Sequence, residues 1–402
     1  MRGFVATLGA MSLLLAGCPP LEPVYVPRLD GDPVRVVPDG TLPVVQQQLA
    51  NNNLDIVQHD GRLFFAWRTA PEHFASPLVQ MHVMSRAPGE DWEFEATFDY
   101  DTDLREPRFL SYRGELTLFF ATLGDNSAEF VPGQARWTRR QGLGEWSEPQ
   151  PFREEGFIPW RTKVVDGVPY MLGYQGGENI YELGSDEPPD PVEVYFLTTN
   201  DGINWTGVDP AQPVVHVGGG SETDIGILAD GTIIGVIRNE LGDEQGFGSK
   251  ICRSHLDTPA VWECEADPRK YDSPLVFVFD ERVFLIARRN VTSTGWYDLG
   301  RTDLSPREQY FEYQTTYWAQ PKRCSLWEVD TETLEVSRLL DLPSAGDTCF
   351  PGMVPYGTED AFLIYNYSSD LTGDLDISWL QGQTSPTNIY SHLLRFEEAE
   401  EE

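Results

Sequence analysis

The chain has 402 residues, of which 40% are hydrophobic and 12% aromatic, and it contains 36 glycines and 30 prolines. This composition is typical of a folded, turn-rich β protein and excludes an intrinsically disordered chain. Its 64 acidic and 29 basic residues give a formal net charge of −35, which excludes nucleic acid and anionic lipid as main partners.

The N-terminus carries the features of an export signal over residues 1–17. Arg2 precedes a short apolar run that has the length of a signal-peptide core and is too short to span a bilayer. The run ends in the string LAGC at residues 15–18, which resembles the lipobox of bacterial lipoprotein signal peptides. That resemblance implies cleavage before Cys18 and lipidation of this cysteine. The alternative is an ordinary secretory signal in which Cys18 occurs by chance.

Residues 18–45 form a proline-rich segment that we interpret as an extended tether. The lipid would be the only attachment to a membrane, because no later apolar run reaches the roughly 18 residues that a spanning helix needs. Pro19, rather than an aspartate, follows the cysteine. By resemblance to sorting in some Gram-negative bacteria, we expect a location in the cell envelope, at the periplasmic or surface face of the outer membrane.

Apart from Cys18, the chain has four cysteines, an even number that suits an oxidising compartment. Four cysteines allow three pairings. Proximity in sequence favours Cys252 with Cys264, across a tight turn between neighbouring strands, and Cys324 with Cys349.

A hairpin unit recurs six times along the chain: an apolar strand, a short polar turn and a second apolar strand. Most turns carry an Asp-Gly-like pair, which supplies the positive φ that tight hairpins need. A second hairpin follows in most units and ends near a tryptophan, at 92, 146, 205 and 262. The six turns are centred on Gly61, Gly114, Gly167, Gly231, Glu281 and Thr358.

This repeat predicts an all-β fold for residues 46–396, a six-bladed β-propeller of four-stranded antiparallel blades. A two-sheet sandwich is the alternative, but it would not repeat at intervals of about 50 residues. We expect no helix. The last unit stops at its third strand, so a strand at 33–37 should complete that blade and close the ring. Residues 397–402 form an acidic tail.

The connections between the second and third strands of the units are long and should emerge together on one face, which we call the long-loop face. Binding sites usually develop on such loops. The connection 290–323 is rich in aromatic residues, including Trp296 and Trp318. Exposed rings suit the C–H faces of sugars, so we predict a carbohydrate or similar polar small molecule as the ligand. The alternative is that these rings pack the loop onto its blade as a small separate core.

Three segments resemble sialidase-like propellers and related glycoside hydrolases. The string TTNDGINW at 198–205 is similar to the Asp-box, a structural turn motif. One hairpin carries Glu222 and Arg238, and the next carries Asp272 and Arg288 at the same spacing. In sialidases a similar hairpin supplies a glutamate that activates a tyrosine nucleophile and an arginine that holds the substrate carboxylate.

The first predicted blade departs from the sialidase pattern. It reads NNNLDIV at 51–57, without the arginine that the family carries there. The departure argues against sialic acid as the substrate and leaves catalysis open. The late tyrosine that the resemblance requires is Tyr365 or Tyr367.

The first strand of each blade should start at the long-loop face and point its first residues at the mouth of the central channel. Paired carboxylates in a shielded site can act as acid and base or nucleophile, and arginine matches a sugar carboxylate. The channel-mouth positions include Asn53, Asp55, Arg105, Glu106, Arg161, Glu222, Asp272 and Asp347. The candidate catalytic residues are Glu222, Asp272, Asp55 and Tyr365. The candidate substrate-binding residues are Arg238, Arg288, Arg105, Arg161, Trp296 and Trp318.

Two functions remain open: a glycoside-hydrolase-like enzyme, and a non-catalytic propeller that binds glycan or protein at the cell surface. The charges could also serve only to fasten the blades together. Two carboxylates about 5–10 Å apart in an open pocket would favour the enzyme. Closed pairs of Arg238 with Glu222 and of Arg288 with Asp272 would count against it.

No phosphate loop, serine-hydrolase motif or zinc-ligand spacing is present, so we expect no cofactor. Asp370, Asp374 and Asp376 could hold calcium, although a solvated acidic loop is the favoured interpretation. We expect the protein to be a monomer.

Overall fold

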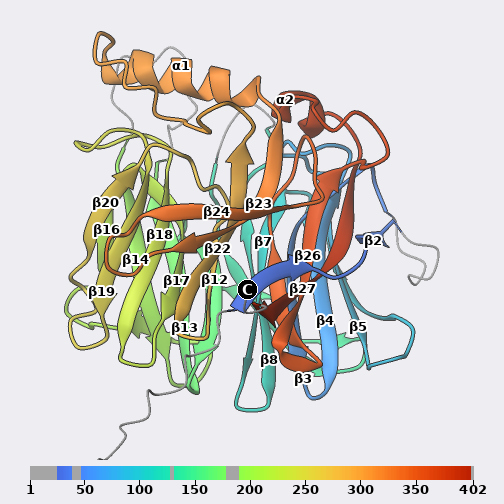
Figure 1. Ribbon diagram of the computed structural model, residues 1–402. Helices are drawn as coiled ribbons and strands as arrows, with labels where there is room; N and C mark the ends of the chain where they lie inside the picture. Colours follow the sequence, from blue (N-terminus) through green and yellow to red (C-terminus); the bar gives the residue numbers. More distant parts are fainter. Residues whose placement is uncertain (1–24, 39–46, 127–130, 178–189, 400–402) are drawn as a thin grey trace, which may run out of the picture.

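The computed structural model describes residues 25–38, 47–126, 131–177 and 190–399. The predicted signal peptide, Cys18 and the start of the tether lie outside these ranges. The described chain is nearly all β-structure, with two helices at one end (Figure 1). Neither of these helices is long and apolar enough to cross a membrane.

Each predicted hairpin is present as an antiparallel strand pair. The turns at Gly61, Gly114 and Gly167 have positive φ values of 74°, 76° and 77°, as tight hairpins require. In the sixth hairpin the positive φ falls on Gly357, one residue before the predicted centre at Thr358.

The first three hairpins each open a group of antiparallel strands. In the second and third groups two short strands share the outer edge. The first group is β3 (Ala50–His59), β4 (Arg62–Ala70), β5 (Gln80–Arg86) and β6 (Glu93–Phe98); the second is β7 (Leu104–Tyr112), β8 (Glu115–Thr122), β9 (Arg136–Gly142), β10 (Glu145–Trp146) and β11 (Gln150–Pro151); the third is β12 (Ile158–Val165), β13 (Val168–Gly176), β14 (Val192–Thr199), β15 (Trp205–Gly207) and β16 (Val214–Gly218).

The remaining hairpins open three further groups, of which the fourth and fifth are separate four-stranded sheets. The fourth group is β17 (Gly220–Ile227), β18 (Thr232–Asn239), β19 (Ser249–His255) and β20 (Glu263–Asp267); the fifth is β21 (Leu275–Phe279), β22 (Arg282–Asn290), β23 (Lys322–Val329) and β24 (Val336–Leu342); the sixth is β25 (Gly352–Tyr356), β26 (Thr358–Ser369) and β27 (Thr387–Glu398).

Two N-terminal strands complete the sixth group. The strand predicted at 33–37 is β2 (Val34–Val37), and it pairs antiparallel with β27. A further strand that the sequence did not predict, β1 (Tyr25–Leu29), pairs with the end of β27. β27 runs through Glu398, so the predicted acidic tail begins inside a strand. One parallel contact, between Thr387 and Ala50, joins the sixth group to the first.

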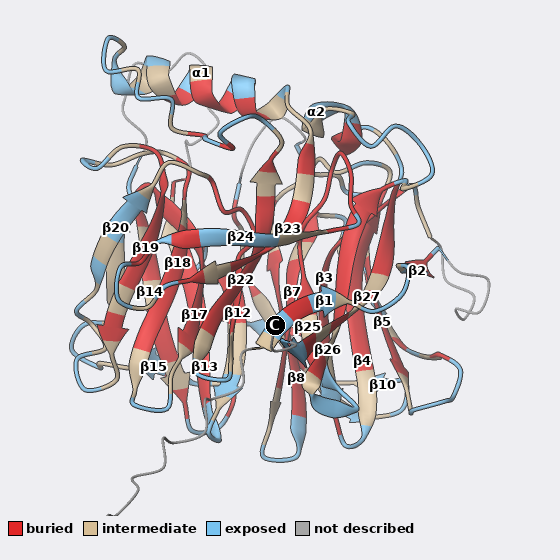
Figure 2. Cartoon of the chain, viewed as in Figure 1, coloured by how far each residue is buried: buried red, intermediate tan, exposed pale blue. Residues whose placement is uncertain are grey.

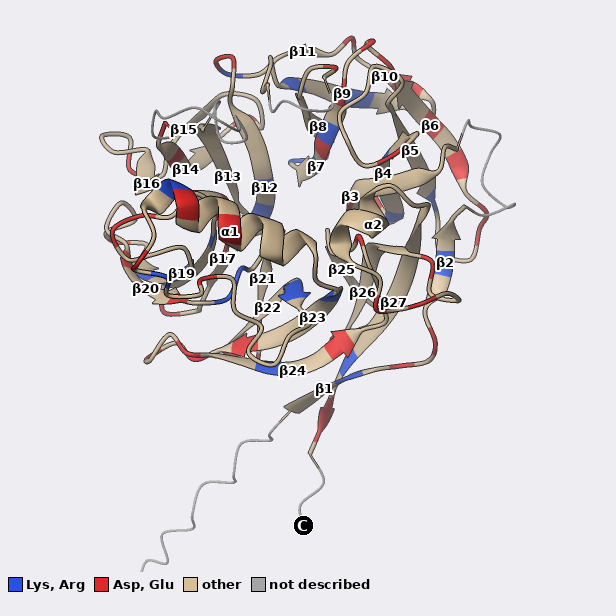
Figure 3. Cartoon of the chain, turned by 90° about the horizontal axis from the view of Figure 1, so that it is seen from above, with Lys and Arg blue, Asp and Glu red and all other residues tan. Residues whose placement is uncertain are grey.

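The hydrophobic core is divided among the spaces between neighbouring groups. Phe64 of the first group packs with Phe109 of the second, and Ile234 of the fourth packs with Val276 of the fifth. The buried side chains follow the strands, whereas the exposed ones concentrate at the turns and loops (Figure 2). Viewed from above, the groups surround a central axis, with the two helices over it (Figure 3).

The expectation that no helix interrupts the strands is wrong for the connection 290–323, which contains α1 (Pro306–Trp318). Ser305 caps this helix, and Glu308 completes a capping box. Tyr310, Tyr313 and Tyr317 are buried in a separate cluster with Phe247 and Tyr297. Most of the aromatic residues in this loop therefore form the small core that was the alternative to ligand binding. A second short helix, α2 (Trp379–Gln383), lies in the connection between β26 and β27.

Both predicted disulfides are confirmed. Cys252 on β19 and Cys264 on β20 are directly opposite each other and are bonded. Cys324 on β23 is bonded to Cys349, which precedes β25. The first disulfide fastens two strands of one group, and the second ties the fifth group to the sixth.

Candidate functional site

A pocket of about 330 Å³ lies at the long-loop end of the central axis, beneath α1 and α2. Its floor is formed by the first residues of several first strands and the last residues of the second strands. Its rim is formed by the helices and the connection after β4. The principal polar residues of its lining are Asn53, His73, Asp103, Arg105, Glu106, Glu222, Arg238, Glu240, Lys270, Asp272 and Arg288.

The first strands are irregular where they reach the pocket. The register of β3 shifts at Asn53, whose φ is 38°, and that of β7 shifts around Glu106, whose φ is 55°. The register of β17 shifts across Glu222, and Ser273 before β21 has a φ of 52°. A bulge redirects a side chain relative to its strand, and bulges and strained backbones are concentrated at functional sites. Three of the groups therefore shift register, and a fourth has a positive φ, where they place polar residues in the pocket.

Glu222 is a buried carboxyl group whose pKa is raised towards neutrality. Its Oε1 lies 2.8 Å from Nη1 of Arg238, and its Oε2 accepts a hydrogen bond of 2.6 Å from the backbone N–H of Ser273. Burial raises its pKa to about 7, and the negative charges of Asp272 and Glu106 act in the same direction, against the attraction of Arg238. Glu222 can therefore hold or release a proton near neutral pH.

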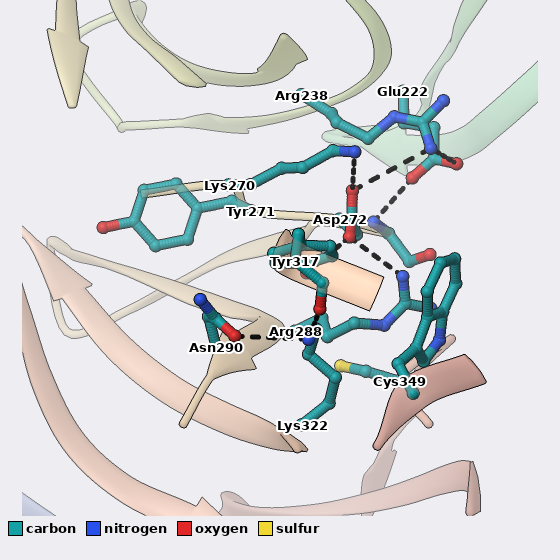
Figure 4. A network of polar contacts seen from close by, with 12 residues as sticks. Glu222, Arg238, Lys270, Tyr271, Asp272, Arg288, Asn290, Tyr317, Lys322 and Cys349 are labelled. Carbon is teal, nitrogen blue, oxygen red and sulfur yellow. Dashed lines mark hydrogen bonds and ion pairs between the residues drawn. The ribbon is translucent and has the colours of Figure 1, made fainter. Parts of the chain in front are cut away.

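Asp272 lies beside Glu222, but its pKa is shifted in the opposite direction. Burial alone would raise its pKa, but the positive charges of Lys270, Arg288 and Arg238 lower it below its ordinary value. Its Oδ2 accepts hydrogen bonds from Arg288 at 2.9 Å and from the hydroxyl of Tyr317 at 2.7 Å. Figure 4 shows these side chains directed at the aspartate. Asp272 therefore stays negative next to a carboxyl group that can be protonated, an arrangement that catalytic carboxyl pairs use.

Glu106 also lines the pocket, but its carboxyl group has fewer hydrogen-bonding and charged partners than those of Glu222 and Asp272. Its Oε1 accepts a hydrogen bond of 3.1 Å from the side chain of Asn53, and its Oε2 makes none. The nearest guanidinium nitrogen, on Arg108, is 3.9 Å away. Burial raises the pKa of Glu106.

The arginines of the pocket are engaged with protein carboxylates. Arg238 pairs with Glu222 and, at 2.7 Å, with Glu240. Arg288 pairs with Asp272 at 2.9 Å and donates from Nε to the carbonyl of Thr348. The two closed pairs that would count against catalysis are thus both present.

Aromatic and apolar side chains form the rim of the pocket. Phe311 and Trp318 come from α1, and Trp379 and Leu380 from α2. The rings of Trp318 and Trp379 lie 6.4 Å apart, and the indole N–H of Trp379 donates to Asp347. Phe311 and Leu380 are 52% and 47% exposed, so this rim is open to a ligand.

Six of the predicted site residues meet at this pocket: Glu222, Asp272, Arg238, Arg288, Arg105 and Trp318.

Asp55 and Arg161 lie deeper in the central channel, at a separate cavity of about 660 Å³. There Asp55 accepts the backbone N–H of Phe109, and Arg161 donates to the carbonyls of Pro274 and Pro351. Asp55 thus ties the first group to the second, whereas Arg161 ties the third group to the segments that precede β21 and β25.

Tyr365 and Trp296 also lie away from the pocket. Tyr365 is fully buried against Phe65, and its hydroxyl accepts a hydrogen bond from Arg86. Tyr367, the other predicted tyrosine, is the one that lines the pocket. Trp296 is 47% exposed and does not line the pocket.

The acidic loop predicted as a calcium candidate does not form a ligand set. Asp376 pairs with Arg323 at 2.7 Å, and the carboxylates of Asp370 and Asp374 cap their own turn. Nowhere in the ranges that the structure describes do three acidic, histidine or cysteine side chains converge so that they could hold a metal ion.

Sequence reasoning placed Asn53 and Glu106 at the channel mouth but did not select them as site residues, and it missed Trp379. A one-residue bulge leaves no clear mark in the sequence. The helix that carries Trp379 does leave one, because Ser378 and Gln381 form a capping box.

The strand groups around an axis, with the polar pocket at one end, define a propeller-like protein whose fold resembles that of solved sialidases. No family model and no curated protein sequence matches the chain. Solved structures do match: a protein of unknown function from Dyadobacter fermentans has a TM-score of 0.59 and 13% identity, over 92% of this chain and 99% of the other.

Two enzymes are also similar in fold. Trypanosoma rangeli sialidase in complex with sialic acid has a TM-score of 0.53 and 10% identity; the match spans 94% of this chain but only 59% of the sialidase. The α-L-arabinofuranosidase Arb93A of Fusarium graminearum has a TM-score of 0.52 and 10% identity, over 86% of this chain and 93% of that enzyme. At these identities the similarity concerns the fold.

Proposed function

We propose that the pocket beneath α1 and α2 binds a carbohydrate. The observation that carries this proposal is the combination of a partly exposed aromatic rim, from Phe311, Trp318 and Trp379, with a floor of charged hydrogen-bonding groups. Ligand pockets typically combine apolar walls with a few fixed polar groups. The fold similarity to a sialidase and an arabinofuranosidase supports the same ligand class.

A second candidate function is hydrolysis of a glycosidic bond, with Glu222 as the general acid. The observation that favours it is the separation of protonation states: the pKa of Glu222 is raised to about 7, whereas that of neighbouring Asp272 is lowered. The closed pairs with Arg238 and Arg288 favour binding without hydrolysis. Binding at this site is common to both candidates, so it is the function we put first.

The test is a screen of purified protein against aryl glycosides, arabinofuranosides among them, and polysaccharides, with binding and hydrolysis measured separately. We expect Trp379→Ala to weaken binding, because it removes one of the aromatic rings of the rim. Glu222→Gln should abolish hydrolysis but retain binding. Glu145→Gln, a change at the exposed first residue of β10, is the matched control. Hydrolysis that survives Glu222→Gln would remove Glu222 from the mechanism, and binding that survives Trp379→Ala would place the ligand elsewhere.

Together with this function, we propose that the fold has six blades and that they close into a ring where β2 completes the sixth blade. The pairing of β2 with β27 and the contact of β27 with β3 support it. A closed ring would hold the pocket residues of different blades at fixed distances.

We further propose that the protein is a lipoprotein of the cell envelope, anchored through Cys18. The string at 15–18 and the two disulfides, which suit an oxidising compartment, support this location. Expression of the full chain in a Gram-negative host with a radiolabelled fatty acid tests it. The wild type should be labelled and sediment with membranes, and Cys18→Ser should be neither. An unlabelled wild type would refute the anchor.

A further inference from the structure

The charge of every arginine and lysine in the pocket lining is already compensated by a protein carboxylate. Arg105 donates to Asp103 at 2.5 Å. Lys270 donates to Glu240 at 3.2 Å and lies 3.7 Å from Asp272. Arg238 and Arg288 are paired as described above. A ligand carboxylate would have to displace one of these internal partners before a guanidinium could hold it.

The carboxylates of the lining are compensated unequally. Asp103 accepts from both Arg68 and Arg105, and Glu240 lies within 3.2 Å of both Arg238 and Lys270. Glu106 has no cation closer than the 3.9 Å to Arg108; its Oε1 accepts a hydrogen bond from the neutral side chain of Asn53, and its Oε2 accepts none. It is therefore the least neutralised carboxylate among the described residues of the lining.

Glu106 is held at the pocket by its strained backbone, with a φ of 55°, and its side chain is 9% exposed. A carboxylate so placed accepts a hydrogen bond from a ligand hydroxyl, and hydrogen bonds to charged groups are the stronger ones. When it is ionised, the same carboxylate repels a ligand carboxylate, and the low dielectric of a buried site increases the repulsion.

Accordingly, we propose that the pocket selects a neutral sugar, one of whose hydroxyl groups donates to Glu106, and rejects sugar acids. This inference rests on the proposed function, since it names the substrate class of the same site. It gives the arginines a structural role in place of the predicted grip on a sugar carboxylate.

Matched pairs of sugars that differ only at the carboxylate test the inference. The probes are the p-nitrophenyl glycosides of glucose and glucuronic acid and of galactose and galacturonic acid, together with N-acetylneuraminic acid. Binding is measured by saturation-transfer NMR and by calorimetry at low salt, so that hydrolysis is not required. We expect at least one neutral member to bind at least tenfold more tightly than its acid.

Two variants locate the selectivity. Glu106→Gln keeps the size of the side chain and removes its charge, so the preference for the neutral member should fall about tenfold or more, the range for interactions with a charged group. Glu145→Gln, far from the pocket, should leave the preference unchanged. Urea unfolding of both variants checks that they are folded.

The outcomes separate the two claims. Tighter binding of an acid by the wild type overturns the neutral-sugar inference and leaves carbohydrate binding intact. An unchanged preference in folded Glu106→Gln overturns the role of Glu106. Absence of binding by every member, together with a negative screen, overturns the proposed function and this inference with it.

Discussion

Replacing Glu222 with glutamine should flatten the dependence of stability on pH between about pH 4.5 and pH 7. In the folded protein burial raises the pKa of this carboxyl group from 4.5 to about 7. Between these two values the folded state holds a proton that the unfolded chain has released. Folding stability therefore falls as the pH rises through this window, and the loss is complete above about pH 7.

The size of the effect follows from the two pKa values. Each unit of difference corresponds to about 1.4 kcal/mol, so ionisation of Glu222 lowers the free energy of unfolding by about 3 kcal/mol. The attraction to Arg238 is already contained in this figure, because it opposes the rise in the pKa. Glutamine does not ionise, and its variant should therefore gain about 3 kcal/mol relative to the wild type as the pH is raised across the window.

Urea unfolding of both proteins at a series of pH values measures this difference. Other groups titrate in the same range: burial lowers the pKa of His73, for example, and that of Lys322 to about 6. Their contributions rise with pH and are shared by both proteins, so they cancel in the difference. Glu145→Gln should run parallel to the wild type. A constant difference between Glu222→Gln and the wild type would show that Glu222 ionises normally and would refute its role as an acid.

Two further changes test the packing of the fold. Asp103→Asn leaves the fully buried guanidinium of Arg68 without its charge partner at 2.8 Å and should cost about 3–5 kcal/mol in urea unfolding; a loss below 1 kcal/mol would show that this pair is not buried as described. Replacing Cys252 and Cys264 together with serine opens a link across 12 residues of sequence and should cost about 3 kcal/mol. If the oxidised wild type had the same free energy of unfolding as the double variant, the disulfide would not stabilise the fold.

The hairpins and the paired site residues could be predicted because they depend on short-range rules. Side chains alternate along a strand, and a tight turn brings the two ends of a hairpin together. Glu222 and Arg238 therefore had to meet once the turn between β17 and β18 was located, and their 2.8 Å contact confirms it. The disulfide across β19 and β20 follows from the same geometry.

The depth of a residue along its strand was harder to predict. Tyr365 and Tyr367 share a face of β26, but only Tyr367 lies at the level of the pocket, because β26 extends to Ser369. Asp55 does not reach the pocket because it lies too far along its strand. β3 starts at Ala50, and the bulge at Asn53 lies between the pocket end of the strand and Asp55. Strand ends depend on contacts with the loops above, which the local sequence does not encode.

The bulges at the pocket bear on the proposed function. A non-glycine residue in the left-handed region costs of order 1 kcal/mol or more, and glycine would adopt the same backbone without that cost. The chain nevertheless has asparagine at position 53 and glutamate at 106, and their side chains meet in the pocket at 3.1 Å. Glycine at either position would remove this hydrogen bond, which joins the first group to the second. The same amide and carboxylate are the groups that the proposed function presents to a ligand.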